Sequence, residues 1–211
     1  MPRPYEIIPL VERTPAWWDW RRGGIGSSDA AALLGEKRFP SPDQLFLEKL
    51  HARTESARSF EQARSVVRER QARAHYCRAA GIEVQPACVQ NTTRPWQRAS
   101  LDGLSANGER AVEIKCGRAT YATTAAHQRP ARNHVPQLQH ILSVTGLPAI
   151  DYWCHCPPHP PLRLEVRRDE AYIARLLAAE EAFWQRFAAA SPAVASGTQR
   201  LEHFRKSVSG G

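Results

Sequence analysis

Two short segments in the middle of the chain contain the residue types best suited to catalysis. Residues 100–104 (SLDGL) contain Asp102, and residues 112–116 (VEIKC) contain Glu113 and Lys115. Side chains alternate between the two faces of a strand, so Glu113 and Lys115 would project together from a strand at 112–116. A hairpin between the segments would bring Asp102 beside Glu113. The spacing therefore predicts one patch with two carboxylates and one ammonium group.

Such a patch suits metal-assisted hydrolysis of a phosphodiester bond. Carboxylates are the hard oxygen ligands that Mg²⁺ prefers, and the bound ion keeps several waters. A lysine beside them can orient or help deprotonate the attacking water, while the metal stabilises charge on the leaving oxygen. The alternative is an ordinary exposed strand, which often carries a Glu/Lys pair. Catalysis therefore needs support from residues elsewhere in the chain.

A second candidate site follows a glycine-rich turn near the N-terminus. Residues 21–35 begin with two arginines, continue through Gly-Gly-Ile-Gly and enter a predicted helix at about Ser28. Free backbone N–H groups, a serine hydroxyl and the positive end of a helix dipole can together bind an anion. A DNA phosphate is a natural ligand for such a site. A capped helix after a flexible loop is the alternative.

The overall charge favours a polyanionic partner. Among 211 residues, 29 are Lys or Arg and 21 are Asp or Glu, a formal net charge of +8. Arginine suits phosphate because its planar fork donates two hydrogen bonds to one oxyanion group. A solvated basic surface is the alternative. No stretch approaches the roughly 18 apolar residues of a membrane span, and the N-terminus lacks a signal segment, so we expect a cytoplasmic protein.

The cysteines and tryptophans have simpler interpretations. The five cysteines are too few and too scattered for a disulfide framework, and none forms a CxxC pair that would favour an iron–sulfur cluster, so we expect buried thiols. Trp17, Trp18 and Trp20 precede the arginine pair. They could stack on a frayed DNA end, but we expect them to pack the N-terminal segment.

The pattern of apolar residues and turn signals predicts a mixed α/β (α+β) domain. Asn107-Gly108 indicates a tight hairpin turn, and the order of elements predicts a mixed sheet with helices packed against it. We expect one domain over residues 1–190 and a flexible tail over 191–211. The expected helices are 28–34, 42–50, 61–80, 135–144 and 169–189, and the expected strands are 82–89, 98–102, 111–116, 150–156 and 162–167.

Four segments in order resemble the motifs of a known family. They are the opening motif at 21–35, with Ile-Gly-x-Ser-Asp, then SLDGL, VEIKC, and PQLQH at 136–140 followed by Val-Thr-Gly. They resemble lambda exonuclease and the YqaJ-like viral recombinases, members of the PD-(D/E)XK nuclease superfamily. The resemblance spans roughly residues 17 to 155. Each motif alone is weak, but four in order are specific.

The resemblance implies a restriction-endonuclease-like core and a role for each motif residue. Asp102 and Glu113 would bind the catalytic metal, with the Ile114 carbonyl as a further ligand. Lys115 would be the catalytic lysine. Gln137 matches the glutamine beside the active site of this family.

A helical acid completes the metal site in this family, and Glu69 is its candidate here. The family pattern is Gly-x-x-x-Glu-Pro-x-Ala-Arg-x-x-Tyr. Residues 69–76 preserve its Glu, Ala, Arg and Tyr, whereas Arg70 replaces the proline and Ser65 the glycine. Glu61 is the second candidate, and a solvated helix charge is the alternative for both.

The activity implied by the resemblance is a Mg²⁺-dependent exonuclease, with Mn²⁺ as a substitute. It would degrade duplex DNA from its ends, chiefly 5′ to 3′, in phage-type recombination, with Arg21 and Ser28 holding the 5′-phosphate. The implied partners are a single-strand annealing protein and further copies of the chain in a trimeric ring. Two alternatives remain open: an endonuclease or junction-cleaving nuclease on the same core, and a catalytically inactive DNA-binding recombination scaffold.

Overall fold

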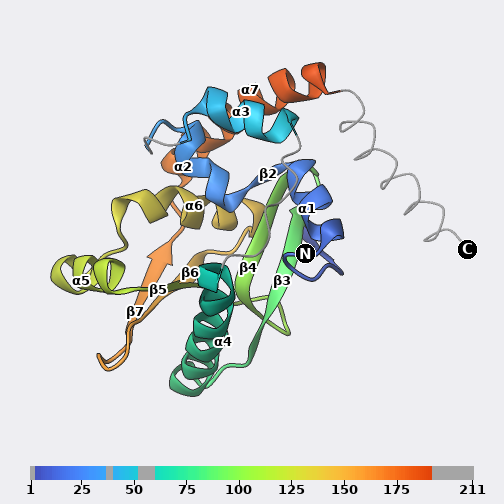
Figure 1. Cartoon of the computed structure of the whole chain (residues 1–211). Coiled ribbons are helices and arrows are strands. Elements are labelled where there is room, and N and C mark those ends of the chain that lie inside the picture. Colours follow the sequence, from blue (N-terminus) through green and yellow to red (C-terminus); the bar gives the residue numbers. More distant parts are fainter. Residues whose placement is uncertain (1–2, 37–39, 52–59, 192–211) are drawn as a thin grey trace, which may run out of the picture.

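The centre of the molecule is a mixed sheet, as predicted, and in the described residues it has seven strands where five were expected (Figure 1). The computed structural model describes residues 3–36, 40–51 and 60–191. The strands lie in the order β1-β3-β4-β5-β6-β7, with β2 beside β4. The β5–β6 and β2–β4 pairs are parallel and the other pairs are antiparallel. The strands are β1 Tyr5–Ile8, β2 Ile25–Gly26, β3 Val84–Asn91, β4 Gln97–Ser105, β5 Ala111–Cys116, β6 Ala149–His155 and β7 Leu162–Arg167.

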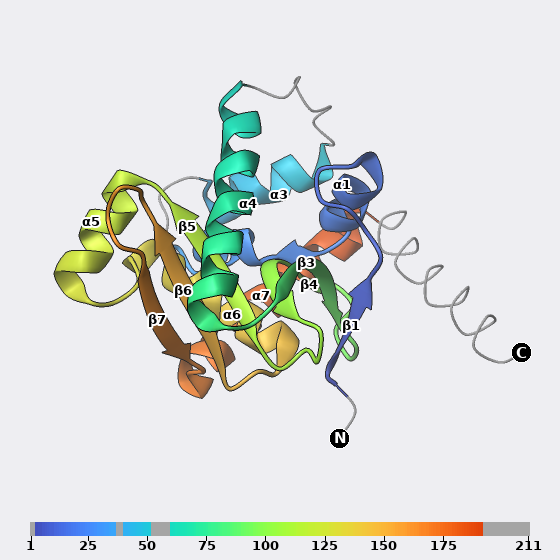
Figure 2. The same cartoon turned by 90° about the horizontal axis from the view of Figure 1, so that it is seen from below.

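Two helices cover opposite faces of the sheet. Alternate residues of β5 pack on different sides: Ala111 joins the hydrophobic cluster under α6, whereas Val112 and Ile114 join the cluster under α4. Figure 2 shows α4 lying across the strands. The helices are α1 Pro15–Arg22, α2 Ala30–Leu33, α3 Pro42–Leu50, α4 Phe60–Ala80, α5 Arg118–His127, α6 Val135–Thr145 and α7 Glu170–Ala190, with 3-10 turns η1 Ser27–Asp29 and η2 Arg132–His134.

A further helical layer lies beyond α6 and is formed by α2, α3 and α7 (Figure 1). Its aromatic core joins α3 to α7: the ring of Phe46 stands edge-on to those of Phe183 and Phe187, with centroids 6.2 and 6.1 Å away. Within the described part of the chain, we find no helix with both the length and the apolar character that a membrane span requires.

Local turn and capping signals explain why most predicted elements are confirmed. Gly108 adopts a left-handed conformation, φ 69°, in the β4–β5 turn, where its N–H donates to the Ser105 carbonyl at 2.8 Å. Ser41 and Gln44 form a reciprocal capping box at the start of α3, with Pro42 in the first turn. These short-range constraints fix where the elements begin and end.

The structure differs from the sequence prediction mainly in the N-terminal third. There β1, α1 and β2 were not predicted, and the helix expected at 28–34 is the 3-10 turn η1 followed by the four-residue α2. At the start of this segment the Asp29 carboxylate accepts the Gly26 N–H at 3.0 Å. So short a helix has little aligned dipole. The predicted anion site therefore depends on side chains. Later in the chain, α5 was not predicted either. The expected tail over 191–211 lies almost wholly outside the described residues, so the domain boundary stays a prediction.

A buried ion pair joins α7 to the sheet. His140 Nδ1 lies 2.5 Å from a Glu180 carboxylate oxygen, and His140 Nε2 lies 2.8 Å from the Arg98 carbonyl. Burial disfavours a charge on His140, yet the Glu180 carboxylate and the Arg98 carbonyl raise its pKa above the usual value. Both ring nitrogens face acceptors, so one extra proton must be shared between His140 and Glu180. Both side chains are fully buried.

We expect Glu180→Ala to lower the free energy of unfolding by about 3–5 kcal/mol, because it leaves the buried His140 ring and the buried Gln97 amide without the carboxylate that contacts both. Urea unfolding followed by circular dichroism measures the change. The control is Glu181→Ala on the exposed side of the same helix, with an expected change within about 0.5 kcal/mol. Equally small effects of both substitutions would show that the buried pair is not needed to hold α7.

Candidate active site

The candidate active site lies where β4 and β5 separate. The strands pair at Gly103–Val112 and Leu104–Ala111, next to the hairpin turn. One residue further, an Asp102 carboxylate oxygen accepts the backbone N–H of Ile114 at 2.6 Å. A side chain thus satisfies a donor that a β4 carbonyl would satisfy in a continuous ladder. The separation leaves Asp102 at the level of Glu113, as the spacing predicted.

Three predicted residues form one hydrogen-bonded group between β5 and α6. Lys115 Nζ donates to Glu113 Oε1 at 2.6 Å and to Gln137 Oε1 at 2.9 Å. Gln137 Nε2 donates to the same Glu113 oxygen at 2.7 Å. Gln137 reaches this position from the first turn of α6, where Pro136 starts the helix. Two segments more than twenty residues apart therefore meet at one carboxylate.

The carboxylates of this group repel one another. Burial, followed by the charges of Glu113 and Glu69, raises the pKa of Asp102 well above its usual value. Burial opposes the charge on Lys115, but Glu113 raises the Lys115 pKa and keeps the ammonium group protonated. Lys115, together with Arg13 and Arg73 next to Glu69, offsets part of the charge of the three acidic side chains. A bound cation would relieve the repulsion that still raises the pKa of Asp102.

Glu69 contributes to the site from α4, on the other side of the sheet from Gln137. Burial raises its pKa, Arg13 and Arg73 lower it, and Glu113 raises it further, so Glu69 lies within electrostatic reach of the β5 group. Its carboxylate pairs with Arg13 Nη2 at 3.6 Å. The other candidate, Glu61, has a side chain outside the described residues.

Arg13 is a functional candidate that the sequence analysis missed. It has a left-handed backbone conformation, φ 65°, which is uncommon for a residue with a side chain. It belongs to the loop between β1 and α1, before the first family motif, and no local sequence pattern predicts its contact with α4. Residues held in such conformations often lie at functional sites.

The donor set fits a hard divalent cation. In the part of the chain that the structure describes, no three His, Cys, Asp or Glu side chains converge closely enough to hold an ion. However, Glu113 Oε2 is buried without a hydrogen-bond partner, and an unpaired buried carboxylate oxygen needs a cation or a donor. Asp102 and Glu69 are the other carboxylates predicted to bind the ion, and Glu69 would have to leave Arg13 to do so. The Ile114 carbonyl as a ligand stays a prediction.

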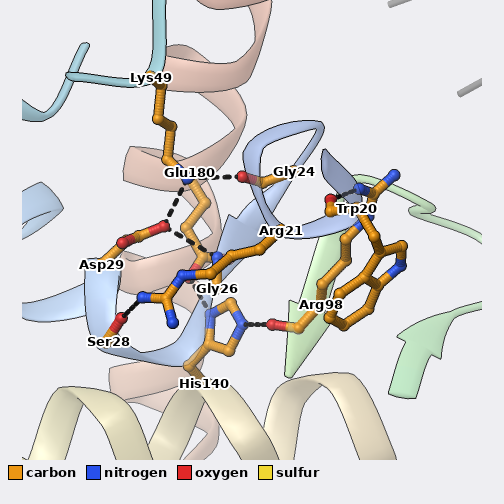
Figure 3. Close-up of polar contacts among 10 residues, drawn as sticks. All are labelled: Trp20, Arg21, Gly24, Gly26, Ser28, Asp29, Lys49, Arg98, His140 and Glu180. Carbon is orange, nitrogen blue, oxygen red and sulfur yellow. Dashed lines mark hydrogen bonds and ion pairs between the residues drawn. The ribbon is translucent and has the colours of Figure 1, made fainter. Parts of the chain in front are cut away.

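The predicted anion site brings Arg21 and Ser28 together (Figure 3). Arg21 Nη2 donates to the Ser28 hydroxyl, and the guanidinium lies 5.2 Å from the ring centroid of Trp17. Trp17 and Trp20 are buried with Ile8 and Cys88. Packing of the tryptophans is therefore confirmed, and the ring of Trp17 also contacts the Arg21 guanidinium.

A direct contact links the segment of the Arg21–Ser28 pair to the carboxylate site. Trp17 Nε1 donates to the Ser100 hydroxyl at 2.9 Å. Ser100 lies two residues before Asp102 on β4, so the two side chains share one face of the strand. The helix that carries Arg21 thus packs against the strand that carries Asp102.

Comparison with known protein families assigns the chain to one of them. The chain matches the model of the YqaJ-like viral recombinase domain over residues 16–148. It belongs to this family. The predicted resemblance is thereby confirmed, and the carboxylates, Lys115, Gln137 and the arginine–serine pair all lie within the matched residues. Arg13 lies just before them. No functionally curated protein is significantly similar to this YqaJ-like protein in sequence.

Solved structures confirm the fold of this YqaJ-like protein. An alkaline exonuclease, LHK-Exo from Laribacter hongkongensis, superposes with a TM-score of 0.72 and 22% identity, over 92% of this chain and 100% of that chain. The same values hold for LHK-Exo in complex with dAMP. A phage-related exonuclease from Haemophilus somnus 129PT gives a TM-score of 0.56 and 12% identity, over 78% of this chain and 95% of that chain.

We expect Arg13→Gln to tighten binding of Mg²⁺ or Mn²⁺ roughly two- to fivefold, because the guanidinium competes with the ion for Glu69 and a partly exposed pair of this kind is worth about 0.2–1 kcal/mol. Titration calorimetry on the DNA-free protein measures the affinity. Arg70→Gln is the control, since it removes the same charge from an exposed position next to Glu69. Weaker metal binding by Arg13→Gln would mean that Arg13 supports the site instead of competing for it.

Proposed function

We propose that this YqaJ-like protein is a divalent-metal-dependent DNA exonuclease that hydrolyses phosphodiester bonds from duplex ends, 5′ to 3′, with Mg²⁺ as the metal and Mn²⁺ as a substitute. The observation that carries the proposal is the contact of Lys115 with both Glu113 and Gln137 beside Asp102. The family and the fold shared with alkaline exonucleases support a nuclease acting on DNA.

In this proposal the acidic residues bind the metal ion and Lys115 orients the reacting groups. Asp102, Glu113 and Glu69 would hold the ion, together with the Ile114 carbonyl, and the bound ion would generate the nucleophile and stabilise charge on the leaving oxygen. Lys115 has three donors, of which two contact Glu113 and Gln137. The third can orient the attacking water or a phosphate oxygen.

Gln137 acts on Lys115 in this scheme. Its amide accepts from Lys115 and donates to Glu113, so it closes a triangle that fixes the ammonium group against the carboxylate. A long, flexible lysine side chain held at two points loses little further freedom when substrate binds.

The Arg21 and Ser28 pocket supports recognition of a 5′-phosphorylated end. Only part of the Arg21 fork is used by Ser28, which leaves further N–H groups for a terminal phosphate. The contact between Trp17 and Ser100 supports this role, because it links the helix of Arg21 to the strand of Asp102. A strand anchored by its 5′ end would therefore present its first phosphodiester to the carboxylates.

The proposed setting is phage-type recombination in the cytoplasm of a bacterial or phage-infected cell. The proposed partners are duplex DNA ends, a single-strand annealing protein, and a trimeric ring of this chain around the DNA. The family supports the setting, and the net charge of +8 supports a polyanionic substrate.

We expect Lys115→Ala to reduce hydrolysis of an end-labelled, 5′-phosphorylated linear duplex by roughly 10²- to 10⁴-fold, because the group that orients the nucleophile is lost. Reactions contain Mg²⁺ or EDTA, and Arg78→Ala, at an exposed position on α4, is the charge-matched control. Turnover unchanged by Lys115→Ala would remove the active-site assignment.

A covalently closed circle runs beside the linear duplex to separate the alternatives. An exonuclease leaves the circle intact. Cleavage of the circle by the wild-type protein would favour an endonuclease. DNA binding by the wild-type protein without any degradation would favour the inactive scaffold.

We expect Arg21→Ala to reduce the preference for 5′-phosphorylated over 5′-hydroxyl ends by roughly 10- to 100-fold, because a hydrogen bond to a charged group is worth about 1.5–3 kcal/mol. Degradation rates of the two substrates give the ratio. Arg22→Ala is the matched control, since the neighbouring guanidinium pairs with Asp19 at 2.6 Å. Equal losses on both substrates would mean that Arg21 binds DNA without reading its end.

A further inference from the structure

A buried carboxylate lies next to the Arg21–Ser28 pair to which we assign a phosphate. Asp29 directly follows Ser28, and its side chain is only 8% exposed. One carboxylate oxygen accepts the Gly26 N–H at 3.0 Å. Burial opposes ionisation of Asp29, but Lys49 and Arg21 lower its pKa below the usual value. A phosphate bound at Arg21 and Ser28 would therefore have an anionic neighbour.

Lys49, which lies in a distant part of the chain, neutralises the charge of the Asp29 carboxylate. Its Nζ lies 2.8 Å from an Asp29 carboxylate oxygen, and it donates to the Gly24 carbonyl, also at 2.8 Å. Lys49 comes from α3, on which it is buried, and Figure 3 shows it pointing down to Asp29 beside the Arg21–Ser28 pair. A buried lysine and a buried carboxylate each need the other, because either alone would be costly to desolvate.

The same lysine also helps to hold the loop that separates Arg21 from Ser28. Gly24 approaches Arg98 so closely that an added Cβ would lie 2.6 Å from Arg98 Cδ and from the Trp96 carbonyl. Lys49 contacts the Gly24 carbonyl from the α3 side. The loop is thus held between two basic side chains, one from the sheet and one from the outer helical layer.

We propose that Lys49 is a positioning and specificity-determining residue for 5′-phosphorylated ends: by neutralising Asp29, it leaves the positive charge of Arg21 available to the terminal phosphate. This inference rests on the proposed role of Arg21 and Ser28. Without Lys49, Asp29 would draw the Arg21 guanidinium into an ion pair and repel a phosphate that carries close to two negative charges. The pocket would keep its shape-determining residues but lose its net attraction for the ligand.

A second substitution separates charge from structure. Lys49→Met removes the ammonium group and keeps an unbranched side chain of similar length, which leaves Asp29 unpaired. In the double variant Asp29→Asn/Lys49→Met, no uncompensated charge remains next to Arg21. If Lys49 acts by neutralisation, the second substitution repairs the defect of the first. If Lys49 acts only by holding the fold, it does not.

Binding without catalysis is the direct test. The full chain in EDTA is titrated with a fluorescent duplex that carries either a 5′-phosphate or a 5′-hydroxyl, and fluorescence anisotropy gives the ratio of the two Kd values. We expect Lys49→Met to lower the phosphate preference roughly tenfold or more. Lys49→Arg and Asp29→Asn/Lys49→Met should retain most of it. Arg186→Met is the control, because it removes another ion pair on α3, with Asp43 at 2.7 Å, and should not change the ratio.

The outcomes distinguish this inference from the proposed function. A preference unchanged in Lys49→Met, or lost in Lys49→Met and not restored in the double variant, would overturn the role of Lys49. Circular dichroism melting shows whether each variant is folded at the assay temperature. If Lys49→Met is unfolded, the double variant provides the test: a folded double variant without phosphate preference also overturns the proposal. A wild-type protein that shows no preference at all would overturn the Arg21–Ser28 assignment itself. A wild-type protein that prefers 5′-phosphorylated ends in EDTA but does not hydrolyse the linear duplex with Mg²⁺ would leave that assignment intact and refute only the nuclease.

Discussion

The bond between the Asp102 carboxylate and the Ile114 N–H determines the geometry of the whole site. Two antiparallel strands that begin at a tight turn would ordinarily continue to pair, and a continuous ladder would leave no room for an ion or a phosphate between them. Here a side chain satisfies the Ile114 donor at 2.6 Å, so the strands separate without an unpaired buried amide. The opening admits Glu113 and Lys115 from β5 and Glu69 from α4. The repulsion among these acids follows from the same opening, and Lys115 and Arg13 offset part of it.

Buried charged pairs add to the apolar packing of the helices around the sheet. His140 and Glu180 connect α6 to α7, and Asp29 and Lys49 connect the η1 turn to α3. Both pairs also bond to main-chain groups, the Arg98 carbonyl in the first and the Gly24 carbonyl in the second. A buried pair gives little net stability compared with apolar side chains of the same volume, but each of these ties a particular helix to a particular backbone atom. That orientation matters here, because both backbone atoms belong to segments beside the arginine–serine pocket.

The parts of the fold that the sequence predicted correctly depend on short-range chemistry. Gly108 requires a left-handed turn, and Ser41 with Gln44 caps α3; such features are visible within four or five residues. The grouping of Asp102, Glu113 and Lys115 followed from strand alternation and one hairpin. The helix expected over 28–34 begins instead as a 3-10 turn, where Asp29 binds the Gly26 N–H and also pairs with Lys49, twenty residues away, a contact that no local pattern predicts. Arg13 could not be found for a related reason: its contact with Glu69 depends on how the β1–α1 loop lies against α4, and no periodicity encodes that.

Burial gives two similar ion pairs opposite roles. In each of the two sites, an acidic side chain next to the expected ligand position is paired with a basic side chain from another element. Asp29 and Lys49 are each 8% exposed and 2.8 Å apart, so separating them would leave two uncompensated charges away from water, and the pair must persist when a ligand binds. Arg13 and Glu69 are 33% and 25% exposed and 3.6 Å apart, so water can replace either partner at little cost. The Asp29–Lys49 pair can therefore stay intact and keep the Asp29 charge neutralised, so that the charge of Arg21 remains available to a phosphate. The Arg13–Glu69 pair can separate, as it must if Glu69 is to bind a metal ion in place of the Arg13 guanidinium.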